Sequence, residues 1–555
     1  MSNLKVKQLT VVALAVAVSL DSTAFAAQKK KASKKATVSK ASNPSKPATV
    51  SDVLAHYGQK DRGANLQMSK FTQMIPTSSL SQSTVVRNTS KIKPPSSVSF
   101  FLKGNEKENQ LEKILDEQIQ ELYTLSQKFR KSPERGEIWL RLGELYVEKA
   151  KMVQMRIQND LDKRLADWEA KGRKGTPPKG NTDAPLVYNK KAIELYDWYA
   201  RDFPKSRKLD QAYFFLGYNY VELNQFKKGM HYYEKLTKEF PRSPYVTESH
   251  FALAEYYFDN NNYKKAEVDY KFVLRDENSR IYPFAMYKIA WVYYRLGQPA
   301  IAIKYLEKVI DIAQQDRESQ SGEGKAVNRI RLADEAYNDL ILFYPDVKPY
   351  ESASQYFTTI GGEDKLYTSL DKLAYLYSDR GQREAAKYIF GQLIEMKPNA
   401  AKNFDYQYQI VQNYWAGGSR QVFRQELFAW VTNYNSESEW AHQNPKEVQR
   451  SYDTRESTLR GFVLQEHKAL QKSHNPVGQK LTRNLYELYI KEFGDSKNVA
   501  EMRFFYGELL YDMGEFDKAS QQYKWVMQNA PESKYYSTAV LNELLALEKS
   551  LPTDK

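Results

Sequence analysis

Cysteine is absent from this chain of 555 residues. Its absence excludes disulfide bonds, a thiolate nucleophile and a zinc site built on thiolates. Histidine is scarce, with six residues scattered along the sequence, and no HExxH motif occurs. We find no other arrangement of acids, bases and nucleophiles with the spacing of a catalytic site. We therefore expect a protein that is not an enzyme and that binds no metal ion or cofactor.

Long apolar runs are missing except at the N-terminus. Lys5 and Lys7 precede the apolar stretch Leu9–Leu20, and Ala24-Phe25-Ala26 places small residues where signal peptidase cleaves. This pattern predicts a secretory signal peptide over residues 1–26, because a membrane-spanning helix needs about 20 apolar residues. No cysteine follows the run to carry a lipid. We expect a soluble, exported protein, periplasmic in a cell with two membranes; the alternative is an uncleaved anchor.

Acidic residues are lacking in the segment Gln28–Pro47, which we call the lysine-rich arm. It holds seven lysines among Ala, Ser, Thr and Pro, in a chain of formal net charge +14. Because such a composition buries little apolar surface, residues 27–104 are predicted to form a disordered arm and linker. The lysine-rich arm is a candidate contact for peptidoglycan or an anionic membrane surface; the alternative is a solubilising spacer. RNA- and DNA-binding motifs are absent, so we expect no nucleic-acid partner.

An eight-residue sequence motif recurs along the chain. Each copy places a large apolar residue before Gly or Ala, and Tyr or Leu three residues after it. The clearest neighbours, Gly217, Ala254 and Ala290, are 37 and 36 residues apart, a period typical of stacked helix pairs. The copies are Trp139–Tyr146, Tyr213–Tyr220, His250–Tyr257, Met286–Tyr293, Leu370–Tyr377 and Arg503–Leu510.

A second small residue lies twelve positions after the first. A bulky residue follows it by four positions, and proline follows eight positions later in three repeats. Two helices approach closely only where facing residues are small, and proline ends the second helix. The small residues are Gly229, Ala266, Ala302, Ala386 and Ala519; the bulky ones are Tyr233, Tyr270, Leu306, Phe390 and Tyr523; the prolines are Pro241, Pro398 and Pro531.

The combined pattern resembles the tetratricopeptide repeat (TPR) family. The repeats that match clearly are Asp210–Pro241, Thr247–Asn278, Pro283–Asp311, Tyr367–Pro398 and Ala500–Pro531. A sixth repeat is split by an insertion: its first helix is Gly136–Arg156, and its second resumes near Ala192. Weaker copies fill the gaps between these repeats.

The resemblance implies an all-α, right-handed superhelical solenoid of about eight or nine helical hairpins. We expect an N-terminal TPR array over residues 105–360, with the insertion at about 157–187. A C-terminal array over 361–548 and a tail at 549–555 would follow. Helices at Lys107–Lys131 and Lys534–Leu547 are expected to cover the two open ends of the stack.

The resemblance also implies a concave groove lined by the first helix of each repeat. The groove positions carry aromatic residues rather than the Lys, Asn and Arg that clamp a C-terminal carboxylate, which favours an apolar or extended peptide, or sugar rings. Trp291 and Tyr294 are the preferred candidates; the alternative is that the rings are packed in the core. The predicted groove residues are Phe214, Tyr218, Phe251, Glu255, Phe258, Phe284, Tyr287, Trp291 and Tyr294.

The joints between repeats, such as FPKS and FPRS, are similar to those of bacterial cell-envelope TPR proteins. These include the outer-membrane assembly lipoprotein, the Tol-Pal coordinator and gliding-motility components, although the lipid-attachment cysteine of the first is missing here. We interpret the chain as a periplasmic scaffold that binds envelope proteins or peptide segments in its groove. The alternative is a peptidoglycan-binding protein that uses the groove aromatics and the lysine-rich arm.

Overall fold

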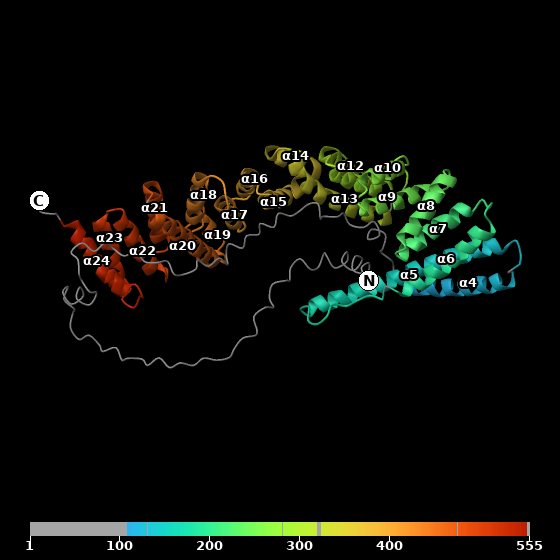
Figure 1. Cartoon of the computed structure of the whole chain (residues 1–555), viewed down its shortest axis with the longest axis horizontal. Coiled ribbons are helices and arrows are strands. Elements are labelled where there is room, and N and C mark those ends of the chain that lie inside the picture. The colour runs from blue at the N-terminus through green and yellow to red at the C-terminus, as the bar shows by residue number, and fades with distance from the viewer. Residues whose placement is uncertain are drawn as a thin grey trace.

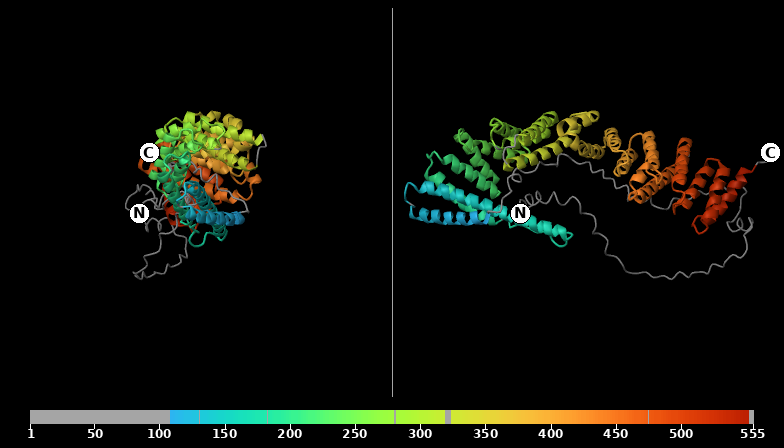
Figure 2. Two further views of the ribbon diagram at one scale, coloured as in Figure 1. Left: turned by 90° about the vertical axis from the view of Figure 1, so that its right-hand side faces the viewer. Right: turned by 180° about the vertical axis from the view of Figure 1, so that it is seen from behind.

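The computed structural model describes residues 108–551, except for 130, 182, 280, 319–322 and 474. The predicted signal peptide at 1–26 and the arm and linker at 27–104 lie outside the described residues. Within those ranges the chain is all-α and forms an elongated, curved array of helices (Figures 1 and 2). The all-α repeat fold predicted from the sequence is therefore confirmed.

The helices of the array follow one another in chain order along its length (Figure 1). Their bounds are α4 Glu108–Lys128, α5 Arg135–Ala170, α6 Ala184–Asp202, α7 Leu209–Glu222, α8 Phe226–Glu239, α9 Val246–Asp259, α10 Tyr263–Val273, α11 Tyr282–Arg295, α12 Pro299–Glu318, α13 Glu323–Phe343, η3 Tyr344–Asp346, η4 Tyr350–Ser352, α14 Ala353–Gly361, α15 Glu363–Asp379, α16 Arg383–Met396, α17 Asn403–Trp415, α18 Arg420–Asn433, α19 Glu439–Gln443, α20 Val448–Ser473, α21 Pro476–Glu492, α22 Val499–Asp512, α23 Phe516–Asn529 and α24 Tyr536–Ser550.

Consecutive helices pack in pairs, and we call the members of each pair the first and second helix. The pairs are α5 with α6, α7 with α8, α9 with α10, α11 with α12, α15 with α16, α17 with α18, α20 with α21 and α22 with α23. In the middle of the array α13 packs on α12 and α14 packs on α15, which departs from the regular pairing. This arrangement agrees with the eight or nine hairpins expected. Helix α4 packs on α5 and α24 packs on α23, so the two ends of the stack are covered as predicted.

The hairpins close where an aromatic ring of the second helix lies on a glycine of the first. A Cβ placed on Gly217 would lie 2.7 Å from the ring of Tyr233, and one on Gly507 would lie 2.6 Å from the ring of Tyr523. Gly143 stands in the same relation to Tyr196, at 2.7 Å. The three rings are buried. Because these glycines have no side chain, the two helices pack closely enough for only the tyrosine ring to lie between their backbones. The pairing of small and bulky residues in the sequence predicted this close packing.

The turn inside each regular hairpin has one repeated geometry. A residue with positive φ lies seven positions after the small residue of the first helix, and Asn or Gly occupies it: Asn224, Asn261, Gly297, Gly381 and Gly514. The next residue donates its backbone N–H to the carbonyl five residues earlier, as in Gln225 to Tyr220 at 2.8 Å. This bond closes a Schellman motif, which ends the first helix in the left-handed conformation that glycine and asparagine tolerate best.

The joint between repeats uses a serine. The hydroxyls of Ser206, Ser243, Ser496 and Ser533 each accept a hydrogen bond from the backbone N–H two residues later, at 3.1 to 3.2 Å. Each of these serines therefore holds the chain at the start of the following helix, which is α7, α9, α22 or α24. This explains why the FPKS, FPRS and APES joints recur.

Helix α5 is 36 residues long, whereas α7, α8 and α9 have 14 residues each. Residues 157–170 continue α5 as helix beyond the end of the predicted first helix, and the chain returns through an exposed turn to α6. The extension projects from the array (Figure 2). The predicted insertion at 157–187 is thus partly helical: residues 157–170 extend α5, and the chain after Lys171 runs back beside them, where Arg164 donates a hydrogen bond to the Lys179 carbonyl.

We predict that Gly217→Ala and Gly507→Ala each destabilise the protein. The added methyl overlaps a buried tyrosine ring, and overpacking of this kind costs about 1–3 kcal/mol. Gly391→Ala is the matched control, because it also lies inside a helix but a Cβ there meets nothing within 4 Å. It should be neutral or stabilise by about 0.5–1 kcal/mol. Thermal unfolding followed by circular dichroism measures both; equal melting temperatures for all three variants would contradict the close-approach assignment.

Candidate binding surface

The predicted groove residues lie on three successive first helices. Phe214 and Tyr218 are on α7, Phe251, Glu255 and Phe258 are on α9, and Phe284, Tyr287, Trp291 and Tyr294 are on α11. Side chains of α7 and α9 share one apolar cluster, and the ion pair Glu255–Lys288 joins α9 to α11. The structure therefore places all nine residues in one region, but it divides them into a buried and a partly exposed group.

Four of the nine side chains are buried. These are Phe258 and Phe284, each 5% exposed, Tyr287, 1% exposed, and Trp291, fully buried. The expectation that Trp291 is an exposed groove residue is therefore wrong. It belongs to the core, and no partner can touch it in this structure.

The reason is that α13 covers the groove side of α11. The Trp291 Nε1–H donates a hydrogen bond of 2.7 Å to the Asp339 carboxylate, and the Tyr287 hydroxyl donates one of 2.6 Å to the same oxygen. The ring of Phe343 meets Trp291 edge to face with centroids 5.1 Å apart. Every residue from Pro283 to Tyr293 is buried. At this point of the array the groove is thus filled by the protein itself.

The Asp339 carboxyl has an unusual environment for an acid. Burial raises its pKa to about 7; the two hydrogen bonds from Tyr287 and Trp291 act in the opposite direction, and the nearby charge of Glu335 raises the pKa further. Desolvation disfavours the charged form of an acid, so this group takes up a proton near neutral pH.

The other five predicted residues are partly exposed. The ring of Tyr294 stacks on Phe343 with centroids 3.8 Å apart, and its hydroxyl donates to Asp346 at 2.8 Å. Phe214 stacks on Tyr245 with centroids 4.8 Å apart. Phe251 meets Tyr270 edge to face at 5.9 Å. These rings each keep one side in contact with the core and leave part of their surface to solvent.

Glu255 and Tyr218 complete this group. The Glu255 carboxylate accepts a hydrogen bond from the Tyr270 hydroxyl and forms an ion pair of 2.9 Å with Lys288. The Nζ of Lys151 lies 4.9 Å from the centroid of the Tyr218 ring. Glu255 is therefore committed to contacts within the array, whereas Tyr218 presents an aromatic face next to a cation.

A row of ion pairs joins neighbouring first helices, and sequence reasoning missed it. In each pair an acid belongs to one first helix or to α13, and the base belongs to the next such helix or its N-cap. The pairs are Glu255–Lys288, Asp334–Lys365, Asp371–Lys402 and Asp405–Arg450, at 2.7 to 3.0 Å. We call them the inter-repeat ladder. In the sequence, each of these pairs is an acid followed by a base 31 to 45 residues later, about one repeat further along the chain.

Exposed tryptophan was also missed. Trp198 on α6 is 40% exposed, and its ring lies 5.7 Å from that of Trp139 on α5. The guanidinium of Arg135 lies 5.5 Å from the Trp139 ring. In the sequence the only signal was that Trp198 follows the acidic residue Glu194 by four positions, which places the two on one face of a helix.

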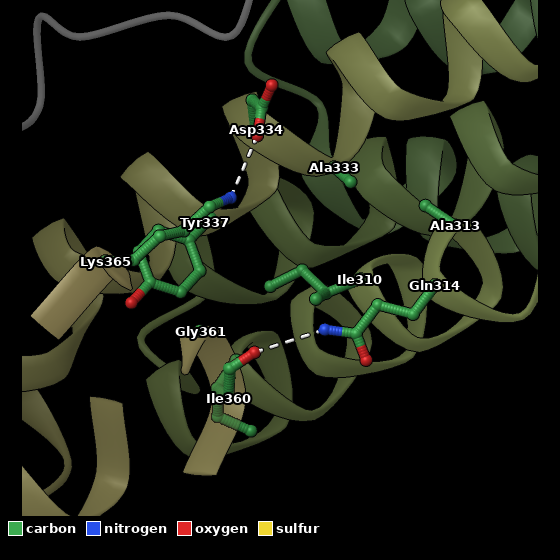
Figure 3. Close-up of a pocket in the computed structure, with 9 residues that line it drawn as sticks. All are labelled: Ile310, Ala313, Gln314, Ala333, Asp334, Tyr337, Ile360, Gly361 and Lys365. Atoms are coloured by element: carbon green, nitrogen blue, oxygen red, sulfur yellow. Dashed lines mark hydrogen bonds and ion pairs between the residues drawn. The ribbon is translucent and has the colours of Figure 1, made fainter. Parts of the chain in front are cut away.

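A small cavity of ≈80 Å³ lies where α12, α13 and the junction of α14 and α15 meet (Figure 3). Lys365 reaches across its edge to Asp334 at 3.0 Å, and the Gln314 amide donates to the Ile360 carbonyl at 3.3 Å. A cavity of this volume holds a few water molecules. It does not accommodate a peptide or a sugar ring.

The described residues contain neither a metal site nor a membrane-spanning helix. No group of three or more His, Asp or Glu side chains there is arranged to hold a metal ion. None of the helices described has the length and apolarity needed to span a membrane.

We predict that Trp291→Ala lowers the melting temperature strongly. The substitution leaves a large cavity, which costs about 3–5 kcal/mol for buried tryptophan, and it removes a donor from Asp339. Trp198→Ala is the matched control and should cost about 1 kcal/mol or less, because the ring is exposed. Thermal unfolding measures both. Similar small effects from the two substitutions would show that the α11–α13 contact is not a core contact.

We predict that Asp339 makes stability fall as pH rises from about 4 to about 7. The unfolded chain loses the proton at the ordinary aspartate pKa, ~3.9, whereas the folded chain keeps it until about pH 7. Across that window the folded state binds more protons, so acid stabilises it, and the contribution is lost above the folded pKa. Asp339→Asn should flatten the melting temperature between pH 5 and pH 8 relative to the unsubstituted chain. Parallel pH profiles for the two chains would refute the assignment.

Comparison with known proteins agrees with this architecture. Models of the tetratricopeptide repeat match residues 284–313, 368–400 and 210–242, which coincide with three of the predicted repeats, and neither model is that of an enzyme. No curated protein matches the sequence.

Among solved structures, the chain is similar to a tetratricopeptide repeat protein from Parabacteroides merdae. The identity is 11%, the match covers 71% of this chain and 99% of that chain, and the TM-score is 0.22. It is also similar to the structure of Naa15/Naa10 bound to HypK-THB. The identity there is 14%, the match covers 80% of this chain and 68% of that chain, and the TM-score is 0.28. Similarity at these levels of identity and TM-score gives no information about function. The chain thus carries tetratricopeptide repeats at residues 210–242, 284–313 and 368–400, within an array of paired helices.

Proposed function

We propose that this protein is a non-enzymatic scaffold that binds other proteins, or extended segments of them, on the face formed by its first helices. The observation that carries the proposal is the succession of partly exposed aromatic rings on α7 and α9. Phe214, Tyr218 and Phe251 each pack against neighbouring side chains of the array and remain partly exposed. Rings held in this way offer a large apolar contact at a small cost in side-chain entropy.

The repeat supports an extended partner. The same position recurs on the next first helix, so a peptide lying across α7 and α9 meets one aromatic contact per repeat. The ion pair Glu255–Lys288 of the inter-repeat ladder fixes α9 on α11, and the stacking of Phe214 on Tyr245 fixes a ring of α7, so these contacts hold rings in place before the partner arrives. Preorganisation of this kind reduces the entropic cost of binding.

We place the scaffold in the cell envelope of a bacterium. This part of the proposal rests on the predicted signal peptide at residues 1–26 and on the joints that are similar to those of envelope TPR proteins. Envelope proteins or peptide segments are the expected partners, and support for assembly of an envelope complex is the expected role.

The glycan-binding alternative receives less support from the geometry. Sugar binding needs exposed rings with carboxylates or amides ready to accept from hydroxyl groups. Glu255 was the candidate acid, and it already pairs with Lys288 and Tyr270. The lysine-rich arm, the other element of that alternative, lies outside the described residues.

The test is affinity capture from an envelope extract with the full chain and with a Tyr218→Ala/Phe251→Ala double variant. We expect a defined protein partner to be captured by the full chain and reduced at least tenfold by the double variant, because two apolar contacts are lost. The control is Tyr388→Ala, which removes a ring that is 39% exposed on the second helix α16. Circular dichroism should show that all chains remain folded.

Equal capture by all three chains would contradict the first-helix face as the binding surface. Capture of peptidoglycan fragments without protein, lost in the double variant, would favour the glycan alternative instead.

A further inference from the structure

Helix α13 lies on the groove side of α11 in the way that a bound segment would. Its Asp339 carboxylate accepts hydrogen bonds from Tyr287 and Trp291, at 2.6 and 2.7 Å. One turn further along α13, the ring of Phe343 meets Trp291 edge to face and stacks on Tyr294, with centroids 5.1 and 3.8 Å apart. Three residues predicted to bind a partner are thus engaged by one stretch of the protein's own chain.

The contact between α11 and α13 depends on a single acid. The bonds from Tyr287 and Trp291 both end on the same oxygen, Oδ2 of Asp339. Helix α13 packs more extensively on α12 than on α11. Its contact with α15 includes the exposed ion pair Asp334–Lys365, at the edge of the ≈80 Å³ cavity (Figure 3). A change in the charge of Asp339 therefore acts on the hydrogen bonds that join α13 to α11.

Charged groups on the helices around Asp339 have other partners. They are Lys288 with Glu255, Arg295 with the Trp291 ring, Glu307 with Tyr356, Lys308 with the Tyr305 ring, Lys365 with Asp334, Lys372 with Asn338 and Arg380 with Asp346. Glu335, one turn before Asp339, adds its negative charge to the effect of burial, and the pKa of Asp339 is raised to about 7. The acid is thus held beside neutral donors rather than beside a cation.

We propose that α13 is an internal occupant of the groove, held on α11 while Asp339 is protonated and released when Asp339 loses its proton. Release uncovers Tyr287 and Trp291, so that the binding face on α7 and α9 extends onto α11. A carboxylate removed from water is costly unless a cation compensates it, and movement of α13 away from α11 returns it to solvent. The inference rests on the proposed function, because it states how the same face is regulated.

The direction of the switch follows from proton binding. In the closed arrangement Asp339 keeps its proton up to about pH 7, whereas in the open arrangement it loses the proton at the ordinary aspartate pKa, ~3.9. Acid therefore favours the closed arrangement, and this preference is lost as the pH rises through about 7. The opening equilibrium should increase roughly 100-fold between pH 5 and pH 8.

The first test is hydrogen–deuterium exchange of the full chain from pH 5 to pH 8, corrected for the intrinsic pH dependence of exchange. We expect opening of α11 and of residues 332–343 to increase roughly 100-fold over this range. The hairpin of α22 and α23 is the internal reference and should change by no more than about threefold. Equal changes in the two regions would overturn the proposal.

Two matched variants assign the effect to Asp339. Asp339→Asn keeps the shape and an acceptor oxygen but cannot titrate, so the increase in opening should disappear. Asp334→Asn is the control, because it makes the same substitution on the same helix at the exposed pair with Lys365. It should keep the increase. Loss of the increase in both variants, or in neither, would refute the role of Asp339.

A third variant gives a readout that does not depend on the folding of the asparagine variant. Tyr287→Phe removes a hydrogen bond that lowers the pKa of Asp339. The midpoint of the pH-dependent opening should therefore move to higher pH. A residue with only a structural role would increase opening at every pH and leave the midpoint unchanged, and that result would contradict the switch.

Hydroxyl-radical footprinting tests whether release uncovers the groove. Trp291 is fully buried and Trp198 is 40% exposed, so Trp198 serves as the reference ring in the same sample. We expect oxidation of Trp291 relative to Trp198 to be at least threefold greater at pH 8 than at pH 5, and equal at both in Asp339→Asn. Unchanged oxidation of Trp291 in the unsubstituted chain would exclude α11 from the binding face.

These measurements use the chain without a partner, so their failure is distinct from failure of the proposed function. If no pH-dependent opening occurs, the rings of α7 and α9 still form a binding face and only the switch is lost. If opening occurs but Tyr218→Ala/Phe251→Ala captures as much partner as the unsubstituted chain, the proposed face is wrong and the pH-dependent contact stands.

Discussion

The close approach of two helices at a residue without a side chain is the contact on which the array depends. In the hairpins closed by Gly143, Gly217 and Gly507, a buried tyrosine ring fills the space where a Cβ would be. The ring fixes the distance and the angle between the two helices. Because glycine or alanine occupies this position in every clear repeat, the packing there also orients each first helix relative to the next. The surface available to a partner follows from that orientation.

The middle of the array shows how one departure from the repeat changes the surface. At four junctions of the array the inter-repeat ladder joins an acid of one helix to a base of a later one. Between α11 and α13 the acid Asp339 instead accepts from the neutral donors Tyr287 and Trp291. Without a cation to stabilise its charge, this acid titrates near neutral pH. The same contact buries the rings that would otherwise extend the groove through α11.

The sequence predicted the fold well because the packing rule is local. The spacing of small residues, bulky residues and prolines located the hairpins, and the family models match at 210–242, 284–313 and 368–400. The candidate site was predicted less well. The sequence marks Trp291 as a groove position, yet α13, which lies outside the clear repeats, covers it. A side chain's exposure depends on such a neighbour, and periodicity within one repeat carries no information about it. The partly exposed rings of α7 and α9 lie where their neighbours keep the regular pattern.

The central claim is that partners bind the first helices, and hydrogen–deuterium exchange of the full chain with and without a captured partner tests it most directly. Backbone amides that a partner covers or stabilises exchange more slowly. We expect the added protection to concentrate on α7 and α9 and to leave the second helices α8 and α10 unchanged. Added protection confined to the second helices, or to the projecting end of α5, would contradict the account.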